Sequence, residues 1–228
     1  GQEIVSWYDL AKWEAEDKVG NPTTSKWQTP ANDIDSFFET GVVFTNNVSI
    51  AQATDRAAAR ISYTNSDLSG YMPNSTLKKN IFNVSASTTS PDKRLEVFTN
   101  VTYFNSAAKG RSETGYGDNN VMQKFVQWGH RELDMKELKS LYRMPDGSQA
   151  TWNRVAWNDA TPNYSNNPYW SRYMNYQNDS RNRIYGNVGF SFKITDFLKF
   201  QYKSNLDFFV DKQYERNAVG SQEQSRYM

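Results

Sequence analysis

His130 is the only histidine of the chain, and cysteine is absent. A single histidine cannot form the histidine pairs or clusters that bind catalytic zinc. A Ser–His–Asp arrangement would have to use His130, which follows Trp128 in a segment expected to be a loop helix. The motif Gly115-Tyr116-Gly117 lacks the third glycine and the strand–turn–helix setting of a dinucleotide-binding loop. We therefore expect no catalytic residue, no cofactor site and no metal site, and we do not expect an enzyme.

Aromatic side chains are the other residues that could recognise a ligand, and the seven tryptophans lie outside the segments predicted below to be strands. Rings stack on the C–H faces of sugars and anchor protein interfaces. The candidates for contact with cargo or a partner are Trp152, Trp157, Tyr169 and Trp170. The alternative is that long ordered loops need aromatic cores of their own. We expect Tyr169 and Trp170 to pin their loop to the rim of the structure, and at most one of Trp152 and Trp157 to make contact.

These loops must be carried by strands, because apolar and polar residues alternate in several segments. From Leu198 to Val210 the even positions are mostly apolar and the odd positions are mostly charged or amide. A strand turns successive side chains to opposite faces, so one face here is nearly all apolar. Five further segments repeat the pattern, with these apolar faces: Phe44, Val48 and Ile50; Ala57, Ala59, Ile61 and Tyr63; Phe82, Val84 and Ala86; Leu95, Val97, Val101 and Tyr103; Ile184, Val188, Phe190 and Phe192.

Each segment has a length of roughly 9–13 residues, close to that of a tilted strand that crosses a bilayer. A membrane barrel turns its apolar face to lipid and its polar face inward. A soluble β-sandwich has the same period, but hides its apolar face under a second sheet. Both interpretations fit the alternation alone.

Composition bears on two further classes of protein, helical membrane proteins and nucleic-acid-binding proteins. The mean hydropathy is -0.83, and no stretch approaches the ~18 apolar residues of a membrane-spanning helix. A barrel remains compatible, because alternation halves the apolar content of every strand. The net charge of +1 gives no basis for a nucleic-acid interface.

The connections alternate between short and long, which favours the barrel. Short turns lie at 53–56, 90–93 and 195–196, whereas the intervening connections are long. Bacterial outer-membrane barrels have short periplasmic turns and long extracellular loops. We therefore predict an all-β fold: an antiparallel transmembrane barrel segment of about six strands. The predicted regions are an extracellular loop region at 1–40, four strands in two hairpins at 41–104, a long extracellular loop at 105–181, two strands at 182–211 and the start of a further loop at 212–228.

The long loop contains helix signals. Val121, Phe125 and Trp128 recur at helical spacing after possible caps at 118–120. Asp134 and Glu137 resemble a capping box, followed by Leu138 and Leu141. We expect a folded extracellular loop with two short helices.

The motifs, taken in order, resemble a known family over nearly the whole chain. Asp35-Ser36-Phe37-Phe38-Glu39-Thr40-Gly41 followed by Thr45-Asn46-Asn47-Val48-Ser49 resembles the first-hairpin stretch of SusC/RagA-type TonB-dependent transporters of Bacteroidetes. Similar motifs continue with Arg60-Ile61-Ser62-Tyr63-Thr64-Asn65, Gly70-Tyr71-Met72-Pro73-Asn74-Ser75, Leu77-Lys78-Lys79-Asn80, Gln127-Trp128-Gly129, Leu133-Asp134-Met135, Asn167-Pro168-Tyr169-Trp170 and Asp179-Ser180-Arg181-Asn182-Arg183. Ala53-Thr54 stands where the family typically has two glycines in the first tight turn.

The resemblance implies a 22-stranded barrel filled by a plug, located in the outer membrane and surrounded by its lipid. It implies import of oligosaccharides or peptides, energised by TonB through a part not found here, with a SusD-type surface lipoprotein as a lid. Six strands cannot close around a plug, so we expect the chain to be one piece of a longer protein. Two alternatives stay open: the same segment as a client of barrel-assembly or secretion machinery, and a soluble β-sandwich binding module.

Overall fold

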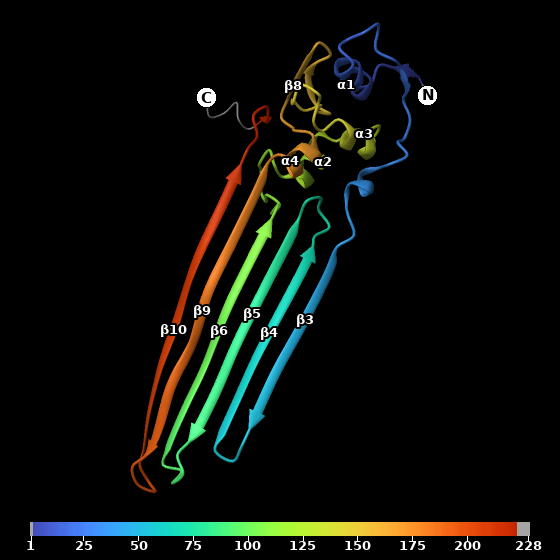
Figure 1. The fold of residues 1–228 in the computed structure, drawn as a ribbon. Coiled ribbons are helices and arrows are strands. Elements are labelled where there is room, and N and C mark those ends of the chain that lie inside the picture. The colour runs from blue at the N-terminus through green and yellow to red at the C-terminus, as the bar shows by residue number, and fades with distance from the viewer. Residues whose placement is uncertain (1, 223–228) are drawn as a thin grey trace.

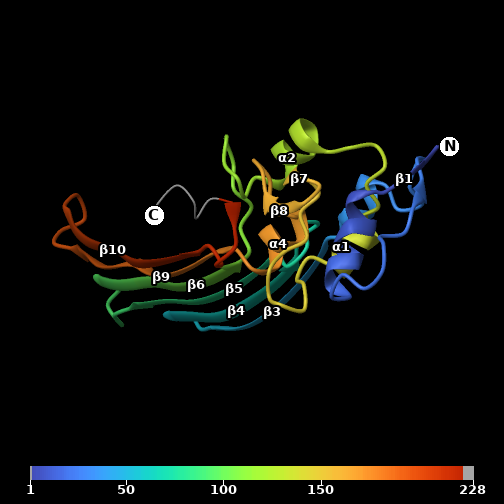
Figure 2. The ribbon, with the colours of Figure 1, turned by 90° about the horizontal axis from the view of Figure 1, so that it is seen from above.

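The computed structural model describes residues 2–222, and its main element is one six-stranded antiparallel sheet. The strands of this sheet are β3 (Val42–Ala53), β4 (Ala57–Ser69), β5 (Thr76–Thr89), β6 (Leu95–Lys109), β9 (Tyr176–Lys193) and β10 (Lys199–Arg216). Their order in space is β10-β9-β6-β5-β4-β3, so strands that are neighbours in this set along the chain also pair in the sheet (Figure 1). The sheet is not closed, and β3 and β10 form its two edges. Viewed from above, it is curved rather than flat (Figure 2).

The remaining elements gather at one end of the sheet, in a part that we call the cap (residues 2–41, 110–175 and 217–222; Figure 1). Its elements are β1 (Glu3–Ile4), α1 (Trp7–Ala15), β2 (Ser25–Lys26), the 3-10 helix η1 (Ile34–Phe37), α2 (Val121–Trp128), α3 (Met135–Ser140), β7 (Arg154–Ala156), β8 (Asp159–Pro162) and α4 (Pro168–Tyr173). The three short turns between strands lie at the opposite end (Figure 1). Short and long connections therefore separate to the two ends of the sheet, as the alternation of turn lengths predicted.

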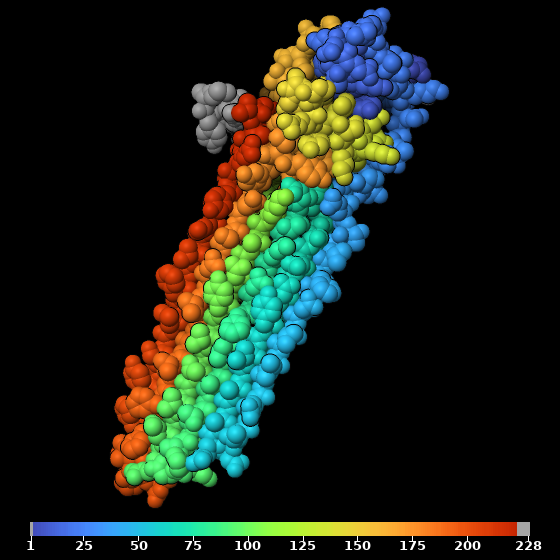
Figure 3. Space-filling model, viewed as in Figure 1, coloured from blue at the N-terminus to red at the C-terminus, as the bar shows by residue number. Residues whose placement is uncertain are grey.

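The hydrophobic core of the molecule lies in the cap, together with Met72 of the β4–β5 connection, and not on the sheet. Its buried members are Phe37, Met72, Val121, Phe125, Leu133, Met135, Leu138, Trp152 and Tyr169. Figure 3 shows the strands side by side along the sheet, with no other segment over the face in view. Within residues 2–222, no helix is long and apolar enough to span a membrane.

Two helices were predicted from the sequence and are present. The spacing of Val121, Phe125 and Trp128 predicted α2, whose first turn is capped by Asn120: its side chain accepts from the N–H of Gln123 at 3.2 Å. Asp134 caps α3 by accepting from the N–H groups of Lys136 and Glu137. The expectation of only two helices in the long loop was wrong, because α4 also forms there after the cap residue Asn167.

The strands extend further toward the cap than the alternation predicted. β6 continues to Lys109 and β9 begins at Tyr176, inside the predicted loop at 105–181. β10 continues to Arg216, so residues 212–216 are strand and not the start of a loop; residues 223–228 of that predicted loop lie outside the described part. The extensions of β9 and β10 are polar on both faces, and cross-strand polar pairs such as Arg181 with Asp211 hold these two strands together there.

Candidate functional site

One face of the sheet carries apolar side chains in rows that cross the strands. We call it the outer face, and we call the opposite, polar face the inner face. In the observed register one row consists of Val48, Tyr63, Phe82, Tyr103, Ile184 and Phe208, each directly opposite the next. The row beside it consists of Ile50, Ile61, Val84, Val101, Gly186 and Leu206. The six apolar faces expected from the sequence therefore lie on one side of a single sheet.

This apolar face is exposed. Phe200, Tyr202, Leu206 and Phe208 keep between 51% and 61% of their surface accessible, so no protein layer covers them. No second sheet packs on the six strands among residues 2–222. Large exposed apolar surfaces mark sites of contact with a membrane, a ligand or a protein partner.

The inner face is polar and carries ion pairs near the cap. Arg181 donates from Nε and Nη2 to the two carboxylate oxygens of Asp211, each at 2.6 Å. Arg183 forms a similar bidentate pair with Asp207. Arg111, just beyond β6, pairs with Asp179. The pairs Arg181–Asp211 and Arg111–Asp179 border a hollow of about 660 Å³ that is also lined by Phe104, Ser106, Gln177, Asn178, Ser180, Gln213, Tyr214 and Glu215. The hollow offers charges of both signs and amide groups to a polar ligand.

Aromatic residues that break the alternation on the inner face have local partners. The guanidinium of Arg181 lies 5.1 Å from the ring centre of Phe209, and that of Arg183 lies 4.9 Å from that of Tyr185. Phe98 packs beside Gly189, where an added Cβ would come within 2.6 Å of its ring. Two of these three exceptions therefore support the arginine pairs by cation–π contact.

The four aromatic candidates of the cap separate into two groups. Trp152, Tyr169 and Trp170 are at most 3% exposed, whereas Trp157 is 74% exposed. The indole N–H of Trp170 donates to the Ser221 hydroxyl at 2.8 Å, and that of Trp152 to the Ser165 hydroxyl at 2.6 Å. Burial raises the pKa of Tyr169 to about 12, with smaller contributions from Tyr173 and Glu39. Of the four, only Trp157 can meet a partner without rearrangement of the cap.

Trp157 lies at the turn between β7 and β8, and Arg154 holds this hairpin in place. Arg154 forms a bidentate pair with Glu14 of α1, at 2.9 and 2.7 Å, and also donates to the Trp157 carbonyl at 3.3 Å. Both partners of the ion pair are largely buried. The exposed ring is therefore presented by a hairpin that is fixed to the rest of the cap.

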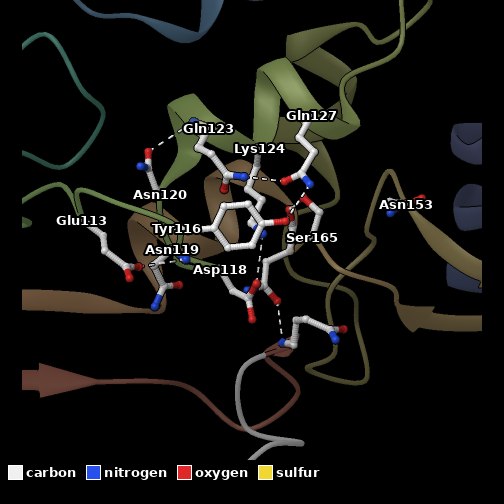
Figure 4. Close-up of polar contacts among 12 residues, drawn as sticks. Glu113, Tyr116, Asp118, Asn119, Asn120, Gln123, Lys124, Gln127, Asn153 and Ser165 are labelled. Atoms are coloured by element: carbon white, nitrogen blue, oxygen red, sulfur yellow. Dashed lines mark hydrogen bonds and ion pairs between the residues drawn. The ribbon is translucent and has the colours of Figure 1, made fainter.

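A second set of polar side chains lies around α2 (Figure 4). From the sequence, only the possible helix caps at 118–120 indicated polar residues at this place. Lys124 forms a buried ion pair with Asp118 at 3.0 Å and lies 5.6 Å from the centre of the exposed Tyr116 ring. Gln127 donates to the Tyr116 hydroxyl at 2.8 Å. An exposed ring with amide groups beside it can hold a neutral polar ligand.

A third observation in the cap is a carboxylate with a displaced pKa. Burial raises the pKa of Glu137 to about 7, and the charges of Asp134 and Asp9 add to the effect. Residues 2–222 contain no group of three or more histidine, cysteine or acidic side chains placed to hold a metal ion.

Comparison with known proteins adds no relative: no protein-family model matches the chain, and no curated protein matches it in sequence.

Proposed function

We propose that this chain forms part of the wall of a transmembrane β-barrel in the bacterial outer membrane, within a SusC-like TonB-dependent transporter that imports oligosaccharides or peptides. The observation that carries the proposal is the continuous apolar face that six strands expose opposite a polar face. Lipid would cover the apolar face, and the polar face would line the interior. The similarity of the motifs to SusC/RagA-type transporters supplies the family.

The free edges support a larger barrel. Every residue of β3 and β10 is exposed, and within residues 2–222 each of these strands has one neighbouring strand. In lipid, each unsatisfied backbone group would cost several kcal/mol. Further strands therefore continue the sheet at both edges, and a wall of about 22 strands leaves room for a plug.

The cap fits the role of an extracellular assembly that meets cargo or a lid. It lies at the end opposite the short turns, which corresponds to the outside of the cell in bacterial barrels (Figure 1). Within the proposal, Trp157 contacts a SusD-type lipoprotein or the cargo, while Trp152, Tyr169 and Trp170 hold the cap together. TonB would act through a part of the transporter outside these residues.

The free edges also favour a second candidate, in which the segment is held by barrel-assembly or secretion machinery. An unpaired strand such as β10 can add to the sheet of another barrel. The soluble sandwich has no such support, because no second sheet covers the apolar face among the described residues.

The test uses the complete gene in its native host. We expect the protein in the outer-membrane fraction, with heat-modifiable gel mobility, and we expect its deletion to abolish uptake of one labelled class of oligosaccharide or peptide. Soluble protein, or unchanged uptake of every class tested, would overturn the proposal. A photo-crosslinker at Gln213 on β10 separates the two candidates: crosslinks within the same chain support the transporter, whereas steady-state crosslinks to an assembly-machinery barrel support the client.

A further inference from the structure

One row of the outer face consists of asparagine on five adjacent strands, beginning with Asn46 on β3, which lies opposite Asn65. Asn65, Asn80, Asn105 and Asn182 lie opposite one another on β4, β5, β6 and β9. Their side chains are joined in one direction: Asn65 donates to Asn80 at 3.1 Å, Asn80 to Asn105 at 3.4 Å and Asn105 to Asn182 at 2.8 Å. We call these four residues the asparagine ladder.

Two tyrosines connect the asparagine ladder to the apolar row on its turn side. The Tyr63 hydroxyl donates to the side-chain carbonyl of Asn80 at 2.7 Å, and the Tyr103 hydroxyl donates to that of Asn182 at 2.8 Å. Both rings belong to the row that contains Phe82 and Ile184. Each tyrosine therefore places its ring among apolar side chains and its hydroxyl among amides, as tyrosines do at a membrane interface.

On β5, β6 and β10 the outer face carries lysine in the two rows on the cap side of the asparagine ladder, whereas on β3 the same two rows hold Phe44 and Val42. Lys78 and Lys212 occupy the next row and Lys109 the row after it, and all three are exposed. The same two rows also contain an acidic residue, Asp67 on β4, which lies opposite Lys78 on β5. The charge is therefore complementary to an anionic headgroup layer.

The length of the apolar face along β10 agrees with the asparagine ladder being the edge of the membrane's apolar layer. On β10 the apolar face extends from Phe200 to Val210, which is opposite Asn182. Ten residues span about 34 Å along a strand, or about 26 Å along the membrane normal at a tilt of about 40°. Transmembrane barrels have an apolar band about 25 Å tall.

We propose that the asparagine ladder, with Lys78, Lys109 and Lys212, binds the phosphate-bearing headgroups of the lipid leaflet on the cap side, an inference that rests on the membrane location proposed above. Each amide nitrogen carries two N–H groups, and the bonds within the ladder use one of them. The second N–H is left for ester or phosphate oxygens of the lipid. Because a row follows the strand tilt, it descends about 9 Å over these four strands, which is comparable to an interfacial layer of about 5–8 Å.

The first test measures depth. The chain has no cysteine, so in the complete barrel Phe82→Cys and Lys78→Cys can each carry a single bimane label on either side of the asparagine ladder. In vesicles of phosphatidylcholine and phosphatidylglycerol, acyl-chain spin labels should quench the label at position 82, and headgroup spin labels should quench the label at position 78. Acyl-chain quenching at 78, or headgroup quenching alone at 82, would overturn the inference. Quenching at neither position would instead overturn the membrane location.

The second test separates headgroup binding from general packing. Combined Asn80→Leu and Asn105→Leu should move the label at 78 into the range of the acyl-chain spin labels. The matched change Asn83→Leu and Asn100→Leu removes a hydrogen-bonded amide pair from the inner face and should leave the depth unchanged. Brominated phosphatidylglycerol should quench the label at 212 (Lys212→Cys) more than brominated phosphatidylcholine, and Lys78→Gln with Lys109→Gln should reduce that preference. Equal quenching by the two lipids without these changes would overturn the role of the lysines.

Discussion

Arg172 of α4 donates from Nε to the carbonyl oxygen of Pro73 at 2.9 Å, and its Nη2 donates to the carbonyl oxygen of Gly110. Asn74 returns a bond to the Arg172 carbonyl at 2.8 Å. One buried side chain therefore joins the cap to the β4–β5 connection and to the end of β6. The cap is attached to the sheet by directed bonds as well as by the chain itself.

Replacing Arg172 by Met should loosen this attachment. The methionine fills similar space but leaves two buried carbonyl groups without their donor, at a cost of about 1–3 kcal/mol each. Hydrogen exchange should become faster at residues 70–75 and 110–111. The same change at Arg143, which is exposed, is the control; equal exchange in both variants would contradict the role given to Arg172.

Gly110→Ala should be much more damaging than Gly147→Ala. Both glycines have positive φ, +63° and +87°, so both alanines bear a backbone penalty of about 1–2 kcal/mol. At Gly110 a Cβ would also lie 2.1 Å from the carbonyl oxygen of Asn74, whereas at Gly147 nothing lies within 4 Å. Chemical unfolding of both variants measures the difference. Equal losses would mean that the contact with Asn74 relaxes freely.

Leu206→Arg should destabilise the complete barrel in lipid by about 2–4 kcal/mol, the penalty for a cation near the bilayer midplane. Leu206 lies near the middle of the apolar run of β10 and is 61% exposed. Asn205→Arg, one residue away on the inner face, should cost much less. Unfolding in vesicles is the measurement, and the ordering of the two variants decides: a larger loss for Asn205→Arg would place lipid on the other face.

The cap should lose stability as the pH rises from about 4.5 to about 7, because of Glu137. Its pKa is raised from 4.5 to about 7 in the folded chain, so the folded state retains a proton that the unfolded state has released. Its stabilising contribution is thus fully present below pH 4.5 and is lost as the pH passes through about 7. Glu137→Gln should flatten the pH dependence of cap hydrogen exchange in this window. Glu16→Gln, at an exposed site, should leave the dependence intact.

Trp157→Ala should leave the fold intact and reduce uptake or lid binding in the complete transporter. The ring is exposed, so its loss removes no core contact. Trp170→Ala removes a fully buried ring and should cost about 3–5 kcal/mol of stability. Surface abundance and uptake, measured together, distinguish the two outcomes. Normal uptake in Trp157→Ala would remove this residue from the proposed contact surface.

The alternation of side chains predicted the strands and their two faces, because a strand's period is read directly from neighbouring residues such as Asn205 and Leu206. It did not predict the cap-side ends of β9 and β10. There, Arg181 and Asp211 pair across strands, and no apolar periodicity records such a pair. The extended segments are correspondingly polar.

Within the cap, helical spacing predicted α2, whereas α1, α4 and the β7–β8 hairpin were not predicted. Composition could not separate Trp157 from Trp152 and Trp170, since their exposure depends on contacts with distant segments: Trp170 meets Ser221, and Arg154 beside Trp157 meets Glu14. The asparagine ladder was missed for the same reason. Its four residues are scattered along the chain and meet only through the strand register.

The position of the cap within the chain has a consequence for the order of folding. β5 and β6 are joined by residues 90–94, whereas β6 and β9 are joined by residues 110–175. Closing the longer connection costs about 2 kcal/mol more in chain entropy, at about 0.6 kcal/mol for each doubling of length. A cap that folds first around its own core brings Lys109 and Tyr176 together and removes much of that cost. The two blocks of strands, β3–β6 and β9–β10, would then join only after the cap has formed. A destabilising substitution in the cap would therefore delay the pairing of β6 with β9, although it changes no residue of a strand.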